Sequence, residues 1–192
     1  MIVLGIDTSL DACSVAIVRD DETLTHFRES MARGQAERLA PMVHDAAKQA
    51  GVAFKDIDRV AVTTGPGSFT GVRVGLSFAR ALALSLDKPC IGVSTLEALA
   101  LEDGEDGAHA ALIETPGASY FARYENGAPI IAPRNIERGE HEALLGGAAL
   151  TGPGVTVNAA ALAIRAARLS PSRYAPDPNY LRAPHVTLPG GS

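Results

Sequence analysis

Residues 65–76 read Gly-Pro-Gly-Ser-Phe-Thr-Gly-Val-Arg-Val-Gly-Leu, and this stretch decides the fold of the chain. It joins a predicted buried strand, Arg59 to Thr63, to a long helix predicted from about Thr70 to Leu86. Through Gly65 and Gly67 the loop could bring its backbone close to an anion at the helix N-terminus. The same residues suit a tight structural turn equally well. The loop is neither a Walker A loop nor a dinucleotide fingerprint, because it lacks the lysine and the glycine spacing.

The chain before this stretch reads as three short strands and a helix. The strands are expected at 2–6, 13–18 and 24–29. The helix carries Leu39, Met42 and Val43 at helical spacing and ends at Gly51. Pro41 lies inside this pattern and predicts a kink or a late start of the helix. A strand meander followed by alternating helices and strands is typical of a ribonuclease-H-like α/β lobe.

The chain after this stretch predicts a smaller second lobe. The composition changes at residues 104–107, so we expect lobes at 1–103 and 104–170 and a proline-rich extended tail at 171–192. Asn126-Gly127 predicts a hairpin turn, since both residues favour positive φ. Asn158 is placed to cap a helix that runs through Leu169, and Ser94 to cap a helix after the strand at 90–93.

Asp7, Thr8 and Ser9 end the first strand. A carboxylate and two hydroxyls at a strand end could hold hydrated magnesium or a phosphate. The tripeptide alone favours a turn in which the side chains satisfy local backbone donors.

The long helix carries a strip of small residues at every fourth position: Gly71, Gly75, Ala79 and Ala83. Such a strip lets another helix approach closely. Arg73 and Arg80 form a polar edge beside it. The strip could pack on the first helix of the same chain, and the two helices together could form a subunit interface. We therefore expect a partner to contact both helices, at Leu39, Met42, Val43, Gly71, Arg73, Gly75, Ala79, Arg80 and Ala83.

Composition narrows the classes of function. Seventeen basic and twenty-two acidic residues give a formal charge of −5, which argues against strong unaided tRNA binding. We expect a cytoplasmic protein, since the N-terminus lacks the pattern of a signal peptide and no apolar run is expected to reach the roughly 18 residues of a membrane span. Cys13 and Cys90 are expected to be buried reduced thiols. The five histidines have no metal-binding spacing on a helix.

Taken together, residues 65–76, Asp7-Thr8-Ser9 and the segment 176–182, Pro-Asp-Pro-Asn-Tyr-Leu-Arg, resemble the TsaB family. The resemblance is strongest over residues 1 to about 100. It implies an actin-like two-lobe fold of the sugar-kinase and Hsp70 type, here with a shortened C-terminal lobe. It also implies a non-catalytic scaffold or activator of TsaD, which transfers threonylcarbamoyl to adenosine 37 of tRNAs that read ANN codons. A small ATPase, TsaE, is the implied third partner, and a homodimer is expected when the partner is absent.

The TsaD family has two metal-binding histidines after its own long helix, in the pattern Asn-His-x-x-x-His. Thr95 and Leu99 stand at these positions here. A leucine cannot coordinate a metal, so the resemblance implies a lost metal site and no catalysis by this chain. No cofactor is expected, although an adenine nucleotide bound at the partner interface without turnover is compatible with the sequence.

Two features leave alternatives open. The segment Glu114-Thr115-Pro116-Gly117 departs from the Asp-Ala-Arg that TsaB proteins tend to show, so contacts of that loop are not carried over. The alternative function is an active ATP-dependent phosphotransferase of the same superfold. It would need a second acidic strand end and a glycine-rich adenosine site in the second lobe, where only Gly146-Gly147 and residues 152–154 offer glycines.

Overall fold

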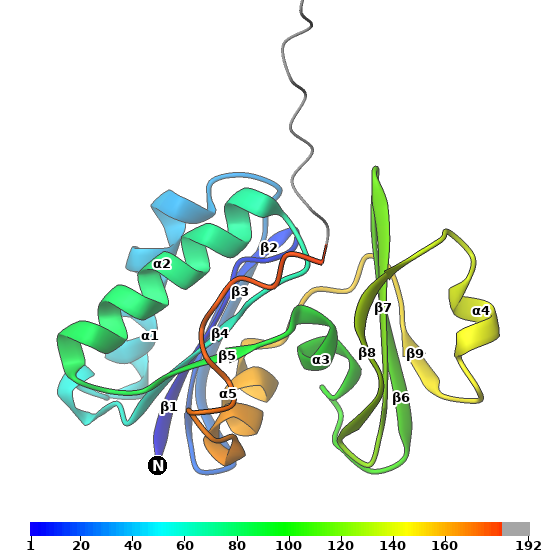
Figure 1. Cartoon of the computed structure of the whole chain (residues 1–192). Coiled ribbons are helices and arrows are strands. Elements are labelled where there is room, and N and C mark those ends of the chain that lie inside the picture. The colour runs from blue at the N-terminus through cyan, green and yellow to red at the C-terminus, as the bar shows by residue number, and fades with distance from the viewer. Residues whose placement is uncertain (182–192) are drawn as a thin grey trace, which may run out of the picture.

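The structure, a computed structural model, describes residues 1–181 and contains two β-sheets with helices on and between them (Figure 1). The first sheet has five strands in the order β3-β2-β1-β4-β5. Its strands are β1 (Ile2–Asp7), β2 (Ala12–Arg19), β3 (Glu22–Ser30), β4 (Arg59–Thr63) and β5 (Cys90–Val93). β1, β2 and β3 pair antiparallel, whereas β4 and β5 extend the sheet in parallel from β1. This is the predicted ribonuclease-H-like topology, and the predicted α/β class is confirmed.

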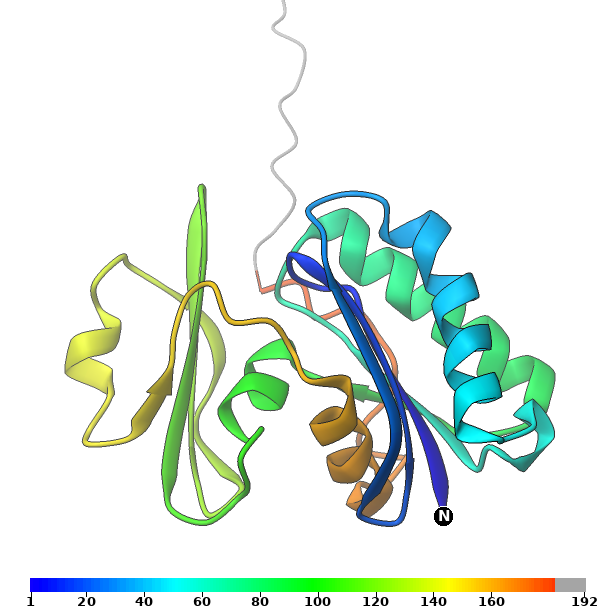
Figure 2. The ribbon, with the colours of Figure 1, turned by 180° about the vertical axis from the view of Figure 1, so that it is seen from behind.

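Helices cover both faces of the first sheet (Figure 2). One face carries α1 (Gln35–Ala50) and α2 (Phe69–Leu86), with the short 3-10 turn η1 (Phe54–Asp56) between them in the chain. The opposite face carries α5 (Ala159–Arg168), which packs on β1 and β2. Successive residues of a strand point to opposite faces, so Leu4 and Ile6 pack under α1 and α2, while Val3 packs on the α5 side.

The second sheet has four strands in the order β8-β7-β6-β9. They are β6 (Ala108–Thr115), β7 (Ala118–Glu125), β8 (Ala128–Ile136) and β9 (Ala149–Thr151). α3 (Thr95–Ala100) packs on β6 and β7, and the one-turn helix α4 (His141–Leu144) lies on the other face. The predicted hairpin turn is confirmed, since Asn126 and Gly127 both have positive φ between β7 and β8.

The middle layer joins the two sheets through one shared core. Val3 of the first sheet, Leu99 of α3, Tyr124 of the second sheet and Leu162 of α5 belong to a single buried cluster. The expected boundary at residue 104 falls between α3 and β6, but the chain returns from β9 to the first sheet at α5 (Figure 2). Residues 159–168, assigned from sequence to the second lobe, therefore pack on the first.

Local features also differ from the sequence expectations. Pro41 lies within α1, which begins at Gln35, so the helix does not start late. Asn158 caps α5 as predicted, with its side-chain oxygen accepting from Ala160 and Ala161. Ser94 precedes α3 but makes no side-chain cap; its hydroxyl instead donates to the carbonyl oxygen of Gly65. Residues 182–192, including Arg182 and the end of the predicted tail, lie outside the described residues.

α2 corrects the expectation that no apolar segment has the length of a membrane span. It has 18 residues and a mean hydropathy of 1.2, and it is the one helix among residues 1–181 that passes this test by length and composition. One face of α2 packs on the sheet, and the other exposes Arg73 and Arg80. A helix that flanks the core of a globular protein meets the same criterion, so the finding is weak evidence for a membrane span.

Candidate functional site

Asp7 lies at the carboxyl end of β1 and is sealed from solvent. Its side chain is fully buried, and Oδ1 accepts hydrogen bonds from the hydroxyls of Ser9 at 2.5 Å and Thr63 at 2.6 Å. Oδ2 is also buried and has no hydrogen-bond partner in the described part of the chain. Burial raises the pKa of Asp7 above its usual value, although the hydrogen bonds from Ser9 and Thr63 act in the opposite direction. The carboxyl group is thus held by the chain itself and does not face an open site.

The turn that follows β1 packs directly against the glycine-rich loop at residues 65–68. The backbone N–H of Ser68 donates to the carbonyl oxygen of Ser9 at 2.7 Å, and a Cβ on Gly67 would overlap that oxygen. Gly65 has positive φ, and its carbonyl oxygen accepts from the backbone N–H of Thr95. Asn179 donates to Thr64 from the C-terminal segment. The glycines therefore allow close contacts within the chain, which favours the tight-turn interpretation over a phosphate cradle at Gly65 and Gly67.

The small-residue strip of α2 packs inside the chain. The Thr8 hydroxyl donates to the carbonyl oxygen of Gly71 at 2.7 Å, and a Cβ on Gly75 would lie 2.6 Å from that hydroxyl oxygen. Ala79 and Ala83 are buried in the same core as β4. The strip contacts the end of β1 and the face of the sheet. It is therefore not available to a partner helix, contrary to the expectation from the sequence.

Most of the other predicted interface residues are buried inside the chain as well. Leu39, Met42 and Val43 of α1 are at most 1% exposed and belong to the core beneath the helices. Of the nine residues expected at the interface, only Arg73 and Arg80 are exposed. The amphipathic spacing identified the buried face of each helix, and an interface must use the opposite face.

The exposed face of α2 carries a cluster that the sequence analysis did not single out. Phe69 is 58% exposed and Tyr180 is 52% exposed, and their ring centroids lie 5.8 Å apart. The guanidinium of Arg73 lies 5.0 Å above the Phe69 ring, and Arg80 reaches Asp177 at 3.9 Å. We call Phe69, Arg73 and Tyr180 the aromatic cluster. Exposed aromatic residues with an arginine are enriched in protein interfaces.

The C-terminal segment brings Tyr180 to this place. The carbonyl oxygen of Tyr174 accepts from the backbone N–H of Gly92 at the free edge of β5, and a Cβ on Gly92 would lie 2.7 Å from the Cα of Pro176. The segment then continues past Thr64 to α2. Prolines at 176 and 178 had indicated an extended chain, but its position beside β5 depends on contacts between distant residues.

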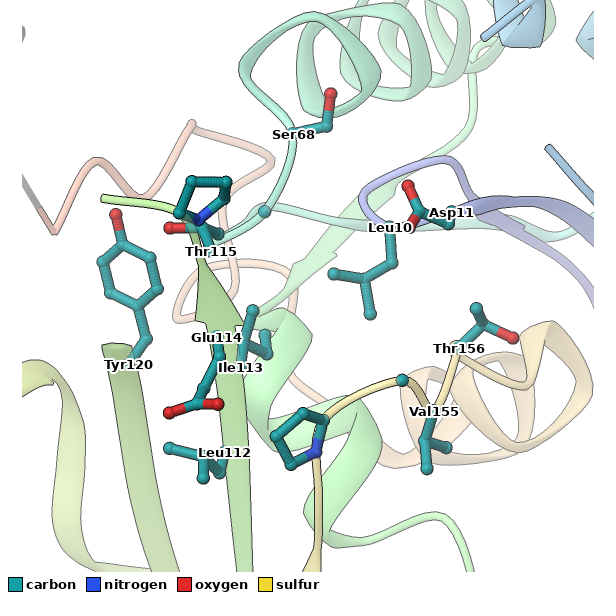
Figure 3. A pocket seen from close by; sticks show the side chains of 14 residues that line it. Leu10, Asp11, Ser68, Leu112, Ile113, Glu114, Thr115, Tyr120, Val155 and Thr156 are labelled. Atoms are coloured by element: carbon teal, nitrogen blue, oxygen red, sulfur yellow. The ribbon is translucent and has the colours of Figure 1, made fainter. Parts of the chain in front are cut away.

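A cleft of about 440 Å³ lies between the two lobes (Figure 3). Leu10 and Ser68 line it from the first lobe, and Ile113, Tyr120 and the loop at 153–156 line it from the second. Among residues 1–181, the charged side chains that line it are Asp11 and Glu114. The atypical loop that begins at Glu114 thus forms part of the cleft wall. These two carboxylates disfavour the binding of a nucleotide's phosphates in the described part of the cleft.

Thr95 and Leu99, the residues at the lost ligand positions, are buried on α3. Leu99 packs in the shared core, and the Thr95 hydroxyl has no partner in the described part of the chain. No group of three His, Cys, Asp or Glu side chains suited to a metal occurs among residues 1–181. The absence of a metal site remains a prediction.

The chain is similar to known proteins in both sequence and structure. The family model TsaD, described as tRNA N6-adenosine threonylcarbamoyltransferase, matches residues 27–120. The tRNA threonylcarbamoyladenosine biosynthesis protein TsaB of Escherichia coli is 42% identical over 129 residues, which are 65% of this chain and 55% of that protein. A solved structure of YeaZ from Pseudomonas aeruginosa superposes with a TM-score of 0.73 at 25% identity, covering 94% of this chain and 99% of that chain.

The chain belongs to the TsaB/YeaZ family. The relatives also include a tRNA N6-adenosine threonylcarbamoyltransferase of Erythrobacter litoralis, 40% identical over 52% of this chain and 34% of that enzyme. The chain spans about half the length of the curated TsaB relatives it matches. The match to the TsaD family model includes the loop at 65–68 and α2.

Proposed function

We propose that this chain is a non-catalytic subunit of the machinery that forms threonylcarbamoyladenosine at position 37 of tRNAs reading ANN codons. In this proposal it is a cytoplasmic scaffold or activator of a TsaD-like transferase. The names of its relatives support the pathway. The sealed carboxylate of Asp7 and the filled loop at Gly67 support the absence of catalysis, since they leave no open strand end at which to hold a phosphate.

The aromatic cluster is the observation that most strongly supports a role in binding a partner protein. Phe69, Arg73 and Tyr180 stand on the outer face of α2, and Val74 and Ser77 extend a shallow groove along the helix. We propose that the TsaD-like partner contacts this face, in place of the buried strip. Arginine and aromatic side chains commonly anchor such contacts. The aromatic rings bury a large area at a small cost in side-chain entropy.

Further partners follow from the same proposal. A TsaE-like ATPase joins the complex, and the outer face of α2 supports a homodimer when the TsaD-like subunit is absent. With a net charge of −5 the chain contributes little direct binding of tRNA. It needs no cofactor of its own, and the acidic lining of the cleft disfavours a nucleotide there.

Co-purification with the TsaD-like protein of the same genome tests the proposal. The tagged chain should retain that protein through size-exclusion chromatography in one stoichiometric peak. Separate elution of the two proteins at micromolar concentrations, in the presence and absence of the TsaE-like ATPase, would remove the basis for a docking subunit.

A further inference from the structure

Arg165 of α5 connects the two lobes. α5 is seated on the first sheet so closely that a Cβ on Gly5 of β1 would overlap the carbonyl oxygen of Ala159. From this helix the Arg165 guanidinium contacts two carboxylates of the second lobe. Its Nε donates to Glu97 at 2.8 Å, and its Nη1 donates to Glu105 at 2.6 Å.

Both carboxylates are attached to the second lobe. Glu97 is on α3, which packs on β6 and β7. Glu105 precedes β6, and its carboxylate lies against the β7–β8 turn, where a Cβ on Gly127 would lie 2.6 Å from Oε2. The backbone N–H of Gly107 donates to the Asn126 side chain at 3.0 Å, which fixes the same segment to the same turn.

The pair of Arg165 and Glu97 is largely withdrawn from solvent. Each side chain is 10% exposed, and the Tyr174 hydroxyl also donates to Glu97 at 3.3 Å. A buried ion pair costs desolvation energy and adds little net stability, but its hydrogen bonds are directional. Directional bonds between two lobes fix an angle more strictly than apolar packing does.

We propose that Glu97, Arg165 and Glu105 form an interlobe clamp that sets the angle between the two lobes. The clamp acts where β6 begins, and the cleft opens where β6 ends, at Glu114 and Thr115. Fixing one end of the strand holds the cleft at one width, so the lobes do not close on a ligand. This goes beyond the proposed docking function, because it concerns the free chain.

Distance measurements between spin labels test the clamp. Labels at Ser77→Cys on α2 and Ala132→Cys on β8, both exposed positions, report the interlobe distance in a Cys90→Ala background. The chain with an intact clamp should give one narrow distribution. Arg165→Met should broaden or shift it. Arg168→Met, on the same helix, is the matched control: its pair with Asp21 at 2.7 Å is exposed, and the distribution should not change.

The deciding variant is the double substitution Glu97→Leu/Arg165→Met, because the single change leaves a buried carboxylate without its cation. The double variant fills the site with apolar side chains and should fold while giving the broadened distribution. Glu105→Ala, at a carboxylate that is 44% exposed, removes half of the clamp and should broaden it less. If these folded variants keep the narrow distribution, the shared core alone sets the angle and the clamp is refuted.

Discussion

The hydroxyl of Thr8 donates a hydrogen bond of 2.7 Å to the carbonyl oxygen of Gly71, so the turn after β1 is attached to the first turn of α2. The contact is possible only because position 71 has no side chain: a Cβ there would overlap the carbonyl oxygen of Thr8. The same turn contacts Gly67 through Ser9. Gly67 and Gly71 thus let the end of β1 and the start of α2 come into direct contact.

Gly71→Ala should destabilise the free chain. The added methyl group overlaps backbone atoms, which cannot move without separating α2 from β1, so a cost of about 1–3 kcal/mol is expected. Thermal and urea unfolding measure this cost. Ser77→Ala on the exposed face of the same helix is the control and should change stability by less than about 0.5 kcal/mol. Equal stability of the two variants would place the close contact elsewhere.

The stability of the Asp7→Asn variant, relative to that of the parent chain, should increase as the pH rises. Burial raises the folded-state pKa of Asp7, so the folded state binds its proton more tightly than the unfolded state does. The parent chain therefore loses stability as the pH rises from the ordinary value of 3.8 through the raised folded pKa, and Asn, which does not titrate, escapes this loss. Urea unfolding of both proteins between pH 4 and 8 gives the difference. A difference that stays constant over this range would contradict the direction of the shift.

Both cysteines should react slowly with a thiol reagent while the chain is folded. Burial raises the pKa of Cys13 and of Cys90 to about 11, so at pH 8 about one thiol in a thousand is the reactive thiolate. The rate of reaction with a disulfide reagent should rise by more than about tenfold in denaturant. Rapid modification of either thiol in the folded protein would show that its surroundings are more open than described.

The sequence predicted the elements better than it predicted their surfaces. Hairpin residues such as Asn126-Gly127 and the cap at Asn158 act locally, and the structure confirmed both. The spacing of Gly71 and Gly75 correctly indicated a close contact. It could not say whether a partner or the chain's own β1 makes that contact, because the answer depends on residues more than sixty positions away.

The parts that sequence reasoning missed all depend on distant contacts. Tyr180 meets Phe69 only because the C-terminal segment passes the edge of β5. α5 returns to the first sheet, although it follows the second lobe in the chain. The sequence offered one signal for the outer face of α2: the large aromatic residue Phe69 at the start of the helix, which the structure shows to be exposed.

The most direct test of the proposed function is threonylcarbamoyl transfer to tRNA by the TsaD-like partner, measured as this chain is added. The chain alone should give no product, and adding it should raise the rate of the partner to a plateau. The double variant Phe69→Ala/Arg73→Glu should need at least about tenfold more protein to reach that plateau, while Arg134→Glu, an exposed change in the second lobe, should match the parent chain. Transfer by the chain alone, or a double variant as effective as the parent chain, would contradict the account of a non-catalytic subunit that docks through α2.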